Sequence, residues 1–286
     1  MTQLAEIRAH VASMGELLNV VGAMRSLASM RLQEAQRALP GIRRYAQTMA
    51  NAIGRTLVLN PEAATTGRAT GGRRALVLYT GEHGFVGGFN EHLLEVAETD
   101  FNAQDVLFVL GSRGATLAQE RGRAMAWSHP MATRLQGVPQ TILRLTAELY
   151  GLIARQEITR AEVMYARYRQ GSAATIERRR LFPLDLASLA VGPVQLPPLH
   201  NLPPAVLLEK LIAEYVFALL TEGATESLAS ENAARFSAME SARDNVSKKL
   251  EQLRQEGRRA RQDEITTELL DLATGAEALQ GSGDSR

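Results

Sequence analysis

The chain has 286 residues, of which 45% are hydrophobic and 22% are charged, a composition typical of folded globular proteins. Its 32 Lys and Arg residues nearly balance 31 Asp and Glu residues, for a net charge of +1, which excludes a global attraction to nucleic acid or to an anionic membrane. The absence of cysteine excludes disulfides, thiolate metal sites, iron–sulfur clusters and a cysteine nucleophile.

Proline placement divides the sequence. Residues 1–39 and 205–286 contain none, whereas six prolines fall between Pro183 and Pro204. Since proline inside a helix costs about 3 kcal/mol, the pattern predicts an N-terminal helix over 1–59, a mixed domain over 73–183, a Pro-rich linker over 184–204, a C-terminal helix over 205–280 and a polar tail over 281–286.

The N-terminal segment carries one long apolar stripe. Alternating steps of three and four residues lead through Leu4, Ile7, Val11, Met14, Leu18, Val21, Arg25, Ala28, Leu32, Ala35, Leu39, Ile42, Ala46, Met49 and Ile53. Only Arg25 is not apolar, and a 3.5-residue period kept this long is typical of a coiled-coil seam. We expect Pro40 to kink or briefly interrupt the helix.

The C-terminal segment has a second stripe with one register slip around residues 257–264. Its members are Met239, Ala242, Val246, Leu250, Leu253 and Ala260, followed by Ile265, Leu269, Leu272, Ala276 and Leu279. An unbroken helix from Pro204 to Leu279 would be about 110 Å long, whereas a compact chain of this size is about 50 Å across. We therefore expect the two terminal helices to pair, antiparallel if the middle domain joins them at one end. Breaks near Gly223 or Gly257 would shorten the second helix.

The middle of the chain alternates between predicted strands and helices. Apolar runs predict strands over 75–79, 106–110, 163–168 and 174–181, and helical patterns fall over 90–99, 112–121 and 138–158. This order predicts a Rossmann-like three-layer α/β domain. Together with the terminal helices, the fold class is α/β with a long antiparallel coiled coil.

A glycine-rich loop over residues 81–90 follows the first predicted strand, where phosphate-binding loops occur. It has no Lys-Ser/Thr pair, and its glycines do not follow the G-x-G-x-x-G spacing, which favours tight turns and close packing over nucleotide binding. The five histidines show no metal-ligand spacing. We predict no catalytic, cofactor-binding or metal-binding residue.

Two charged stretches lie in the C-terminal helix, at residues 230–235 and 258–262. A solvated helix face explains such stretches in most proteins. Beside a long coiled coil, arginines at this density also suit a docking surface for acidic segments of a partner.

The whole chain resembles the gamma subunit family of F-type ATP synthases. The resemblance rests on Ser-Leu-Ala-Ser-Glu-Asn-Ala-Ala-Arg at 227–235, Met239, Asp244-Asn245, Ala260-Arg261-Gln262, Ile265-Thr266 and Glu268-Leu269, on Glu6-Ile7-Arg8 and Ala23-Met24-Arg25 through Gln36, and on the glycine turn at 84–90. The C-terminal motif is long enough to be specific.

The resemblance implies a rotor shaft, present once per complex, inside a ring of three alpha and three beta subunits. Its α/β domain would be a foot beside the epsilon subunit and the membrane ring of c subunits, with no nucleic-acid partner and with membrane contact only through the complex. The complex would lie on the cytoplasmic side of a bacterial inner membrane as a peripheral assembly. This chain would transmit torque and would carry no catalytic residue.

The same resemblance implies two sets of contact residues. The expected alpha and beta ring contacts are Met24, Arg25, Ser230, Glu231, Asn232, Arg235, Arg259, Arg261 and Gln262. The expected contacts on the c-ring and epsilon side are Gly84, Gly87, Gly88, Asn90, His200 and Asn201.

The sequence departs from the family pattern mainly in the foot. Glu82-His83 replaces an acidic–basic pair, Val86 replaces a cysteine, and His200-Asn201 stands where family members often carry Tyr-Glu. These departures suggest a divergent branch, with a differently built or sodium-driven rotor.

Two other classes of function remain open. An α/β enzyme would need a site in the glycine loop and would bind nucleotide as an isolated chain. A static coiled-coil scaffold would associate into a symmetric dimer.

Overall fold

The computed structural model describes residues 3–60, 62, 72–169, 174–189 and 199–281. The chain forms two compact units, Met1–Ser26 with Ser237–Arg286 (unit 1) and Leu27–Phe236 (unit 2). Within the described residues, none of the helices combines the length and the apolar character needed to cross a membrane.

Two long helices, α1 (Gln3–Leu57) and α6 (Pro204–Gly281), contribute to both units. The expected interruption at Pro40 is absent, because α1 continues through it. Pro40 and Gln36, four residues earlier, are both exposed, so water can bond the carbonyl that lacks a helical donor. Gly223 and Gly257 likewise lie inside an unbroken α6.

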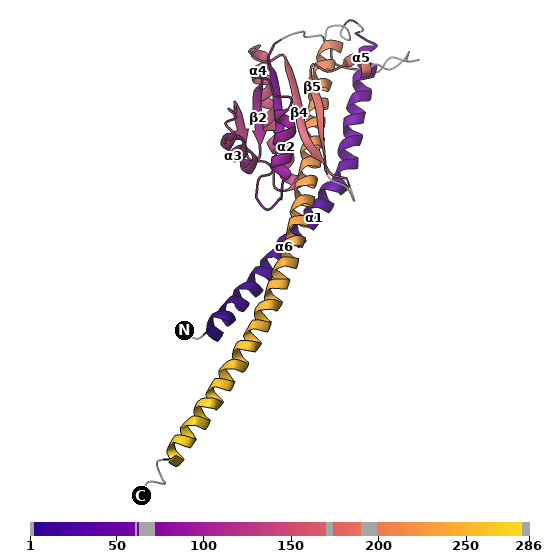
Figure 1. Cartoon of the computed structure of the whole chain (residues 1–286). Helices are drawn as coiled ribbons and strands as arrows, with labels where there is room; N and C mark the ends of the chain where they lie inside the picture. The colour runs from indigo at the N-terminus through magenta and orange to yellow at the C-terminus, as the bar shows by residue number, and fades with distance from the viewer. Residues whose placement is uncertain (1–2, 61, 63–71, 170–173, 190–198, 282–286) are drawn as a thin grey trace. The chain divides into compact units, whose positions relative to one another are not determined.

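Within unit 1 the two helices run antiparallel. Arg25 pairs with Glu240 at one end of this unit, and Ile7 lies against Gly257 at the other. Met239, Leu250 and Leu253 are buried along the seam, as the apolar period predicts. Figure 1 shows α6 continuing past the start of α1, and the last part of the predicted stripe, Ile265, Leu269 and Leu272, is exposed.

Within unit 2 the remaining halves of α1 and α6 also pack antiparallel. Ile53 and Leu57 form a buried cluster with Leu208, near the start of α6, and Arg43 pairs with Glu222, further along it. The coiled-coil prediction is therefore confirmed separately in each unit.

The sheet of unit 2 has the strand order β3-β2-β1-β4-β5. Its strands are β1 (Arg74–Tyr79), β2 (Val106–Leu110), β3 (Trp127–His129), β4 (Arg160–Arg167) and β5 (Thr175–Phe182). The first four are mutually parallel, and β5 runs antiparallel to β4. Strand β3 was not predicted from the sequence, because three residues are too few to show a strand period.

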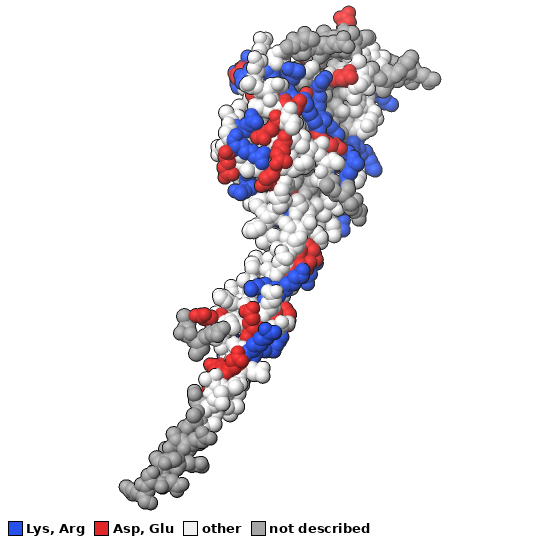
Figure 2. Space-filling view, in the orientation of Figure 1, with Lys and Arg blue, Asp and Glu red and all other residues white. Residues whose placement is uncertain are grey.

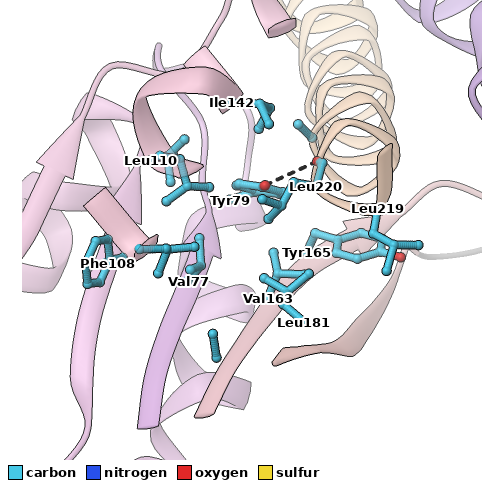
Figure 3. Packing of buried hydrophobic residues seen from close by; sticks show 14 of the residues in the cluster. Val77, Tyr79, Phe108, Leu110, Ile142, Val163, Tyr165, Leu181, Leu219 and Leu220 are labelled. Atoms are coloured by element: carbon cyan, nitrogen blue, oxygen red, sulfur yellow. Dashed lines mark hydrogen bonds between the residues drawn. The ribbon is translucent and has the colours of Figure 1, made fainter. Parts of the chain in front are cut away.

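Helices cover both faces of this sheet and give the predicted three layers. The helices are α2 (Phe89–Glu98), α3 (Ser112–Glu120) and α4 (Val138–Ala154), with a short α5 (Leu186–Leu189) after β5 and a 3-10 turn η2 (Leu135–Gly137) before α4. Leu76 and Leu78 of β1 pack with α2 and α3 on one face. Val77 and Tyr79, on the other face, pack with α4 and α6, as Figure 3 shows in part.

Candidate functional site

The most unusual part of the molecule is the helix–sheet junction, which we define as residues 218–235 of α6. From Ala218 to Asn232 every residue except Thr221 is buried, so this segment is enclosed on all sides. Its buried polar side chains are Glu222, Thr225, Glu226, Ser227, Ser230, Glu231, Asn232 and Arg235. Since buried polar groups are costly unless they are paired, their partners explain how the helix is held.

Side-chain hydroxyls join the helix to carbonyls at the ends of two strands. Ser227 Oγ donates to the Tyr79 carbonyl at 2.9 Å, and Ser230 Oγ donates to the Ala166 carbonyl at 2.8 Å. In the reverse direction, Tyr79 Oη donates to the Leu220 carbonyl at 3.2 Å (Figure 3). Burial raises the pKa of the Tyr79 hydroxyl well above its usual range, so this hydroxyl remains a donor.

An ion pair at the end of the junction holds the glycine loop. Arg235 Nη2 donates to Glu231 Oε1 at 2.6 Å and to the carbonyls of His83 and Gly84 at 3.3 Å each. Burial raises the pKa of the Glu231 carboxyl, while the Arg235 charge opposes that shift. The pair therefore ties a loop of the sheet domain to α6.

These contacts show where part of the predicted ring-contact set lies. Ser230, Glu231, Asn232 and Arg235 are buried inside unit 2. Ser230 contacts β4 and Arg235 contacts the glycine loop, whereas the Asn232 side chain bonds the Leu228 carbonyl of α6. Their contact with an alpha and beta ring stays a prediction. The one-dimensional sequence could not reveal this burial, because a run of polar residues on a helix is usually solvated.

The glycine loop has its own internal supports. The Gly81 N–H donates to Asn90 Oδ1 at 2.7 Å. The Glu82 carboxylate accepts from the Ser112 N–H and hydroxyl at 2.9 and 2.7 Å, and from the Met131 N–H at 2.8 Å. Glu82 thus fixes the loop to the N-terminus of α3, where a negative charge is favoured.

Phe85, at the tip of this loop, is a candidate contact residue that was not predicted from the sequence. Its φ of 61° lies in the left-handed region, and its side chain is 67% exposed. A bulky residue in this conformation is strained, and such strain often marks a binding loop. An aromatic residue within a glycine run was the available signal. Gly84 is half-buried, and Gly87 and Gly88 are exposed beside it.

The structure does not bring together the residues expected on the c-ring and epsilon side. The glycine loop contacts Arg235, whereas His200 and Asn201 are exposed just before α6 begins at Pro204. Pro204 and Glu231 lie about 40 Å apart along α6, because an α-helix rises about 1.5 Å per residue. The two sets therefore lie at different ends of unit 2, and the contact of each with the c ring or epsilon stays a prediction.

The remaining predicted ring contacts lie in unit 1. Met24 and Arg25 of α1 are half-buried, and Arg25 pairs with Glu240 of α6. Arg259, Arg261 and Gln262 are exposed on α6. Figure 2 shows Lys and Arg interspersed with Asp and Glu on these helices. A shallow groove between the helices is lined by Leu4, Ile7, Arg8, Val11, Leu253, Arg254, Gly257, Arg258 and Arg261.

No group of three or more Asp, Glu or His side chains suited to a metal ion occurs in the part of the chain that the structure describes. The buried acidic residues Glu162, Glu222, Glu226 and Glu231 are instead paired with arginines. The arrangement suits the mechanical joining of a sheet domain to a helix pair.

Comparison with known proteins identifies what the chain is similar to. The sequence profile of the family described as ATP synthase matches residues 3–279. The ATP synthase gamma chain of Frankia casuarinae is 29% identical, over 97% of this chain and 98% of that protein. The gamma chain of Geotalea daltonii is 26% identical, over 98% and 100%.

Solved structures are similar in fold. The rotor of the Euglena gracilis mitochondrial ATP synthase aligns with a TM-score of 0.62 at 14% identity, over 92% of this chain and 98% of that chain. A chain from the central stalk and c-ring structure of the Tetrahymena thermophila mitochondrial ATP synthase aligns with a TM-score of 0.56 at 16% identity, over 78% and 99%.

Proposed function

This chain belongs to the ATP synthase gamma chain family, and we propose that its exposed residues divide between the two ends of a rotor shaft. The chain is the central shaft that couples rotation of the membrane c ring to conformational cycling of the catalytic beta subunits. It is a non-catalytic subunit, and its partners are the alpha, beta, epsilon and c subunits.

The observation that carries this mechanism is the antiparallel pairing of α1 and α6 in each unit. One helix pair presents different side chains in different directions, so three equivalent beta subunits around it meet three different surfaces. Each beta subunit is then held in a different conformation, and rotation passes those conformations from one subunit to the next.

The ring contacts that we propose are the accessible members of the predicted set. They are Met24, Arg25, Arg259, Arg261 and Gln262. Guanidinium groups bind carboxylates through paired hydrogen bonds, so Arg259 and Arg261 suit acidic loops of the ring. The buried members of the predicted set, Ser230, Glu231, Asn232 and Arg235, form part of the helix–sheet junction, and their contact with the ring stays a prediction.

We assign the two ends of unit 2 to different neighbours. His200 and Asn201, just before α6, face the c ring and the epsilon subunit. The glycine loop, with Gly84, Gly87 and Gly88 and with Phe85 at its tip, lies at the end of unit 2 where α6 leaves the sheet domain, and faces the alpha and beta ring. Asn90 is buried and supports this loop from inside. The whole assembly lies on the cytoplasmic side of a bacterial inner membrane.

Site-directed crosslinking tests these assignments, because the chain has no cysteine of its own. Single cysteines at Arg261 and at Phe85, carrying a photoreactive label, are expected to crosslink to alpha or beta subunits in the assembled complex. A cysteine at Asn201 is expected to label the c ring or epsilon instead. The matched control is Arg113, an exposed residue of α3, and crosslinking of the ring from this position alone would contradict the assignment.

A further inference from the structure

Two buried glutamates of the helix–sheet junction contact arginines from three other elements. Glu222 Oε1 accepts from Arg43 Nε of α1 at 3.1 Å, and Glu222 Oε2 accepts from Arg179 Nη1 of β5 at 2.6 Å. Glu226 accepts from Arg43 Nη2 and forms an ion pair with Arg167 Nε of β4 at 3.6 Å. We name these five residues the glutamate clamp.

The clamp is asymmetric in exposure. The Glu226 side chain is 3% exposed, whereas the side chains of the three arginines are between 31% and 40% exposed. Arg43 is the centre of the arrangement, since its guanidinium bridges two glutamates that are one helical turn apart. Each glutamate also has a second arginine, so the contacts link α6 to α1 and to the sheet at once.

Such contacts fix the rotation of α6 about its own axis. Apolar packing is non-directional. The aliphatic residues around the clamp therefore oppose the separation of α6 from the sheet more strongly than they oppose the rotation of α6 about its own axis. A turn of one residue, about 100°, would remove both carboxylates from their arginines and leave buried charges unpaired, which is strongly unfavourable.

The position of the clamp matters for a shaft. In the proposed function, torque enters at the end of unit 2 that faces the c ring, through the sheet domain as well as through the start of α6, and it must pass along α1 and α6 together. Hydroxyl contacts from Ser227 and Ser230 also cross this boundary, but they reach strand ends only. Within the part of the chain that the structure describes, the clamp is the one set of ion pairs that joins α6 to the sheet and to α1 at the same time.

We propose that the glutamate clamp is the torsional lock through which the sheet domain drives the helix pair, with Glu222, Glu226 and Arg43 as its positioning residues. This inference rests on the proposed function. If the clamp is weakened, α6 is expected to rotate about its own axis relative to the sheet and α1. Rotation of the sheet domain would then be transmitted incompletely to the helix pair, although the fold is retained.

The test uses the whole ATP synthase in vesicles, with wild-type, Arg43→Gln and Arg43→Lys chains. Arg43→Gln is expected to lower the ratio of gradient-driven ATP synthesis to ATP hydrolysis about threefold, and Arg43→Lys less, because lysine keeps the charge but cannot bridge both glutamates as a planar fork. Hydrolysis by the alpha–beta–gamma complex without the membrane sector is expected to stay unchanged, since no torque then passes through the sheet domain.

A stiffness measurement separates a torsional role from a merely structural one. The rotational fluctuations of a bead attached to the sheet domain, with the ring fixed, should widen in Arg43→Gln and Glu226→Gln. The matched control is Arg155→Gln, which removes an exposed ion pair to Glu157 within one loop of the same unit and should change neither readout.

The proposal would be contradicted if Arg43→Gln had the wild-type ratio of ATP synthesis to hydrolysis and the wild-type width of rotational fluctuations, whatever the result for Glu226→Gln. Absence of coupling in a complex carrying the wild-type chain would instead contradict the proposed function itself. The two failures are therefore distinguishable.

Discussion

Single residues in this chain combine charge with burial in ways that set its response to pH. Arg74, 5% exposed at the start of β1, donates to Asp100 Oδ2 at 2.7 Å and also pairs with Asp105 and Glu162. The hydrogen bond from Arg74 is the main cause that lowers the pKa of Asp100 below its ordinary 3.8, and Arg178 adds to it. A carboxyl with a lowered pKa stabilises the fold above its unfolded pKa, and that contribution is lost as the pH falls.

We predict that Asp100→Asn lowers the free energy of unfolding at pH 7 by about 0.5–1 kcal/mol, a modest value because the Asp100 side chain is 40% exposed. The difference from wild type should shrink as the pH falls below 3.8, the ordinary pKa, because the wild-type carboxyl then becomes protonated. Urea unfolding of the isolated wild-type and variant chains, at a series of pH values between about pH 3 and pH 7, measures this difference in the free energy of unfolding. A difference that stays constant with pH would refute the electrostatic explanation.

Phe85 allows stability and function to be separated at one residue. Phe85→Gly is expected to raise the free energy of unfolding by about 1 kcal/mol, since glycine adopts a positive φ without steric cost. It should nevertheless lower gradient-driven ATP synthesis in the assembled complex, because the proposed contact at the loop tip is lost. Leu143→Ala, at an exposed apolar residue of α4, is the control and should leave synthesis unchanged. A glycine variant with full synthesis would remove Phe85 from the proposed interface.

At the scale of elements, close packing of α6 on the sheet depends on Gly223. A Cβ at this position would lie 3.0 Å from the ring of Tyr165 and 3.3 Å from that of Tyr79. Both rings are fully buried, so neither can move aside easily. A glycine inside a helix is therefore retained here for packing.

The same substitution at two helical glycines of unit 2 is predicted to have opposite effects. Gly223→Ala should lower the free energy of unfolding by about 1–2 kcal/mol through overpacking. Gly41→Ala in α1, where no atom lies within 4 Å of the added Cβ, should raise it by about 0.5–1 kcal/mol through helix propensity. Thermal and urea unfolding of both variants measure these changes in the free energy of unfolding. If Gly223→Ala were stabilising, the rings of Tyr79 and Tyr165 would be able to move aside for the added Cβ.

The elements differ in how far the sequence could predict them. The helix seam was predictable, because a 3.5-residue period directly reports a buried stripe, and Val21, Ala28, Ala35 and Leu39 are buried as expected. The burial of Glu231 and Arg235 was not, because it depends on strands and a loop about 70–150 residues away in the chain, and local polarity suggests solvent. The alternation of buried and polar residues cannot specify β3, which has only three residues.

At the scale of the whole molecule, the apolar stripe in the last described part of α6 is exposed. Ile265, Leu269 and Leu272 are between 48% and 71% exposed, although they continue the apolar stripe. A helix without tertiary packing is marginally stable in water. This stretch therefore depends on another surface for its burial, and the enclosing ring is the partner that the shaft role supplies.

We predict that the amide hydrogens of residues 263–270 exchange faster than those of residues 239–253 in the isolated chain, by about 10-fold or more. Assembly with alpha and beta subunits should slow the exchange of the first stretch strongly and that of the second less. Hydrogen exchange with mass detection measures both states. Equal protection of the two stretches in the isolated chain would contradict the view that the exposed stripe weakens the end of α6.

The central claim is that one copy of this chain occupies the middle of a ring of catalytic subunits. The measurement that tests it most directly is the mass of the complex purified after co-expression with alpha and beta subunits from the same source, together with its rate of ATP hydrolysis. The account predicts one copy of this chain per ring of three alpha and three beta subunits, with hydrolytic activity. A chain that stays apart from those subunits as a symmetric homodimer would contradict it and would favour a static coiled-coil scaffold.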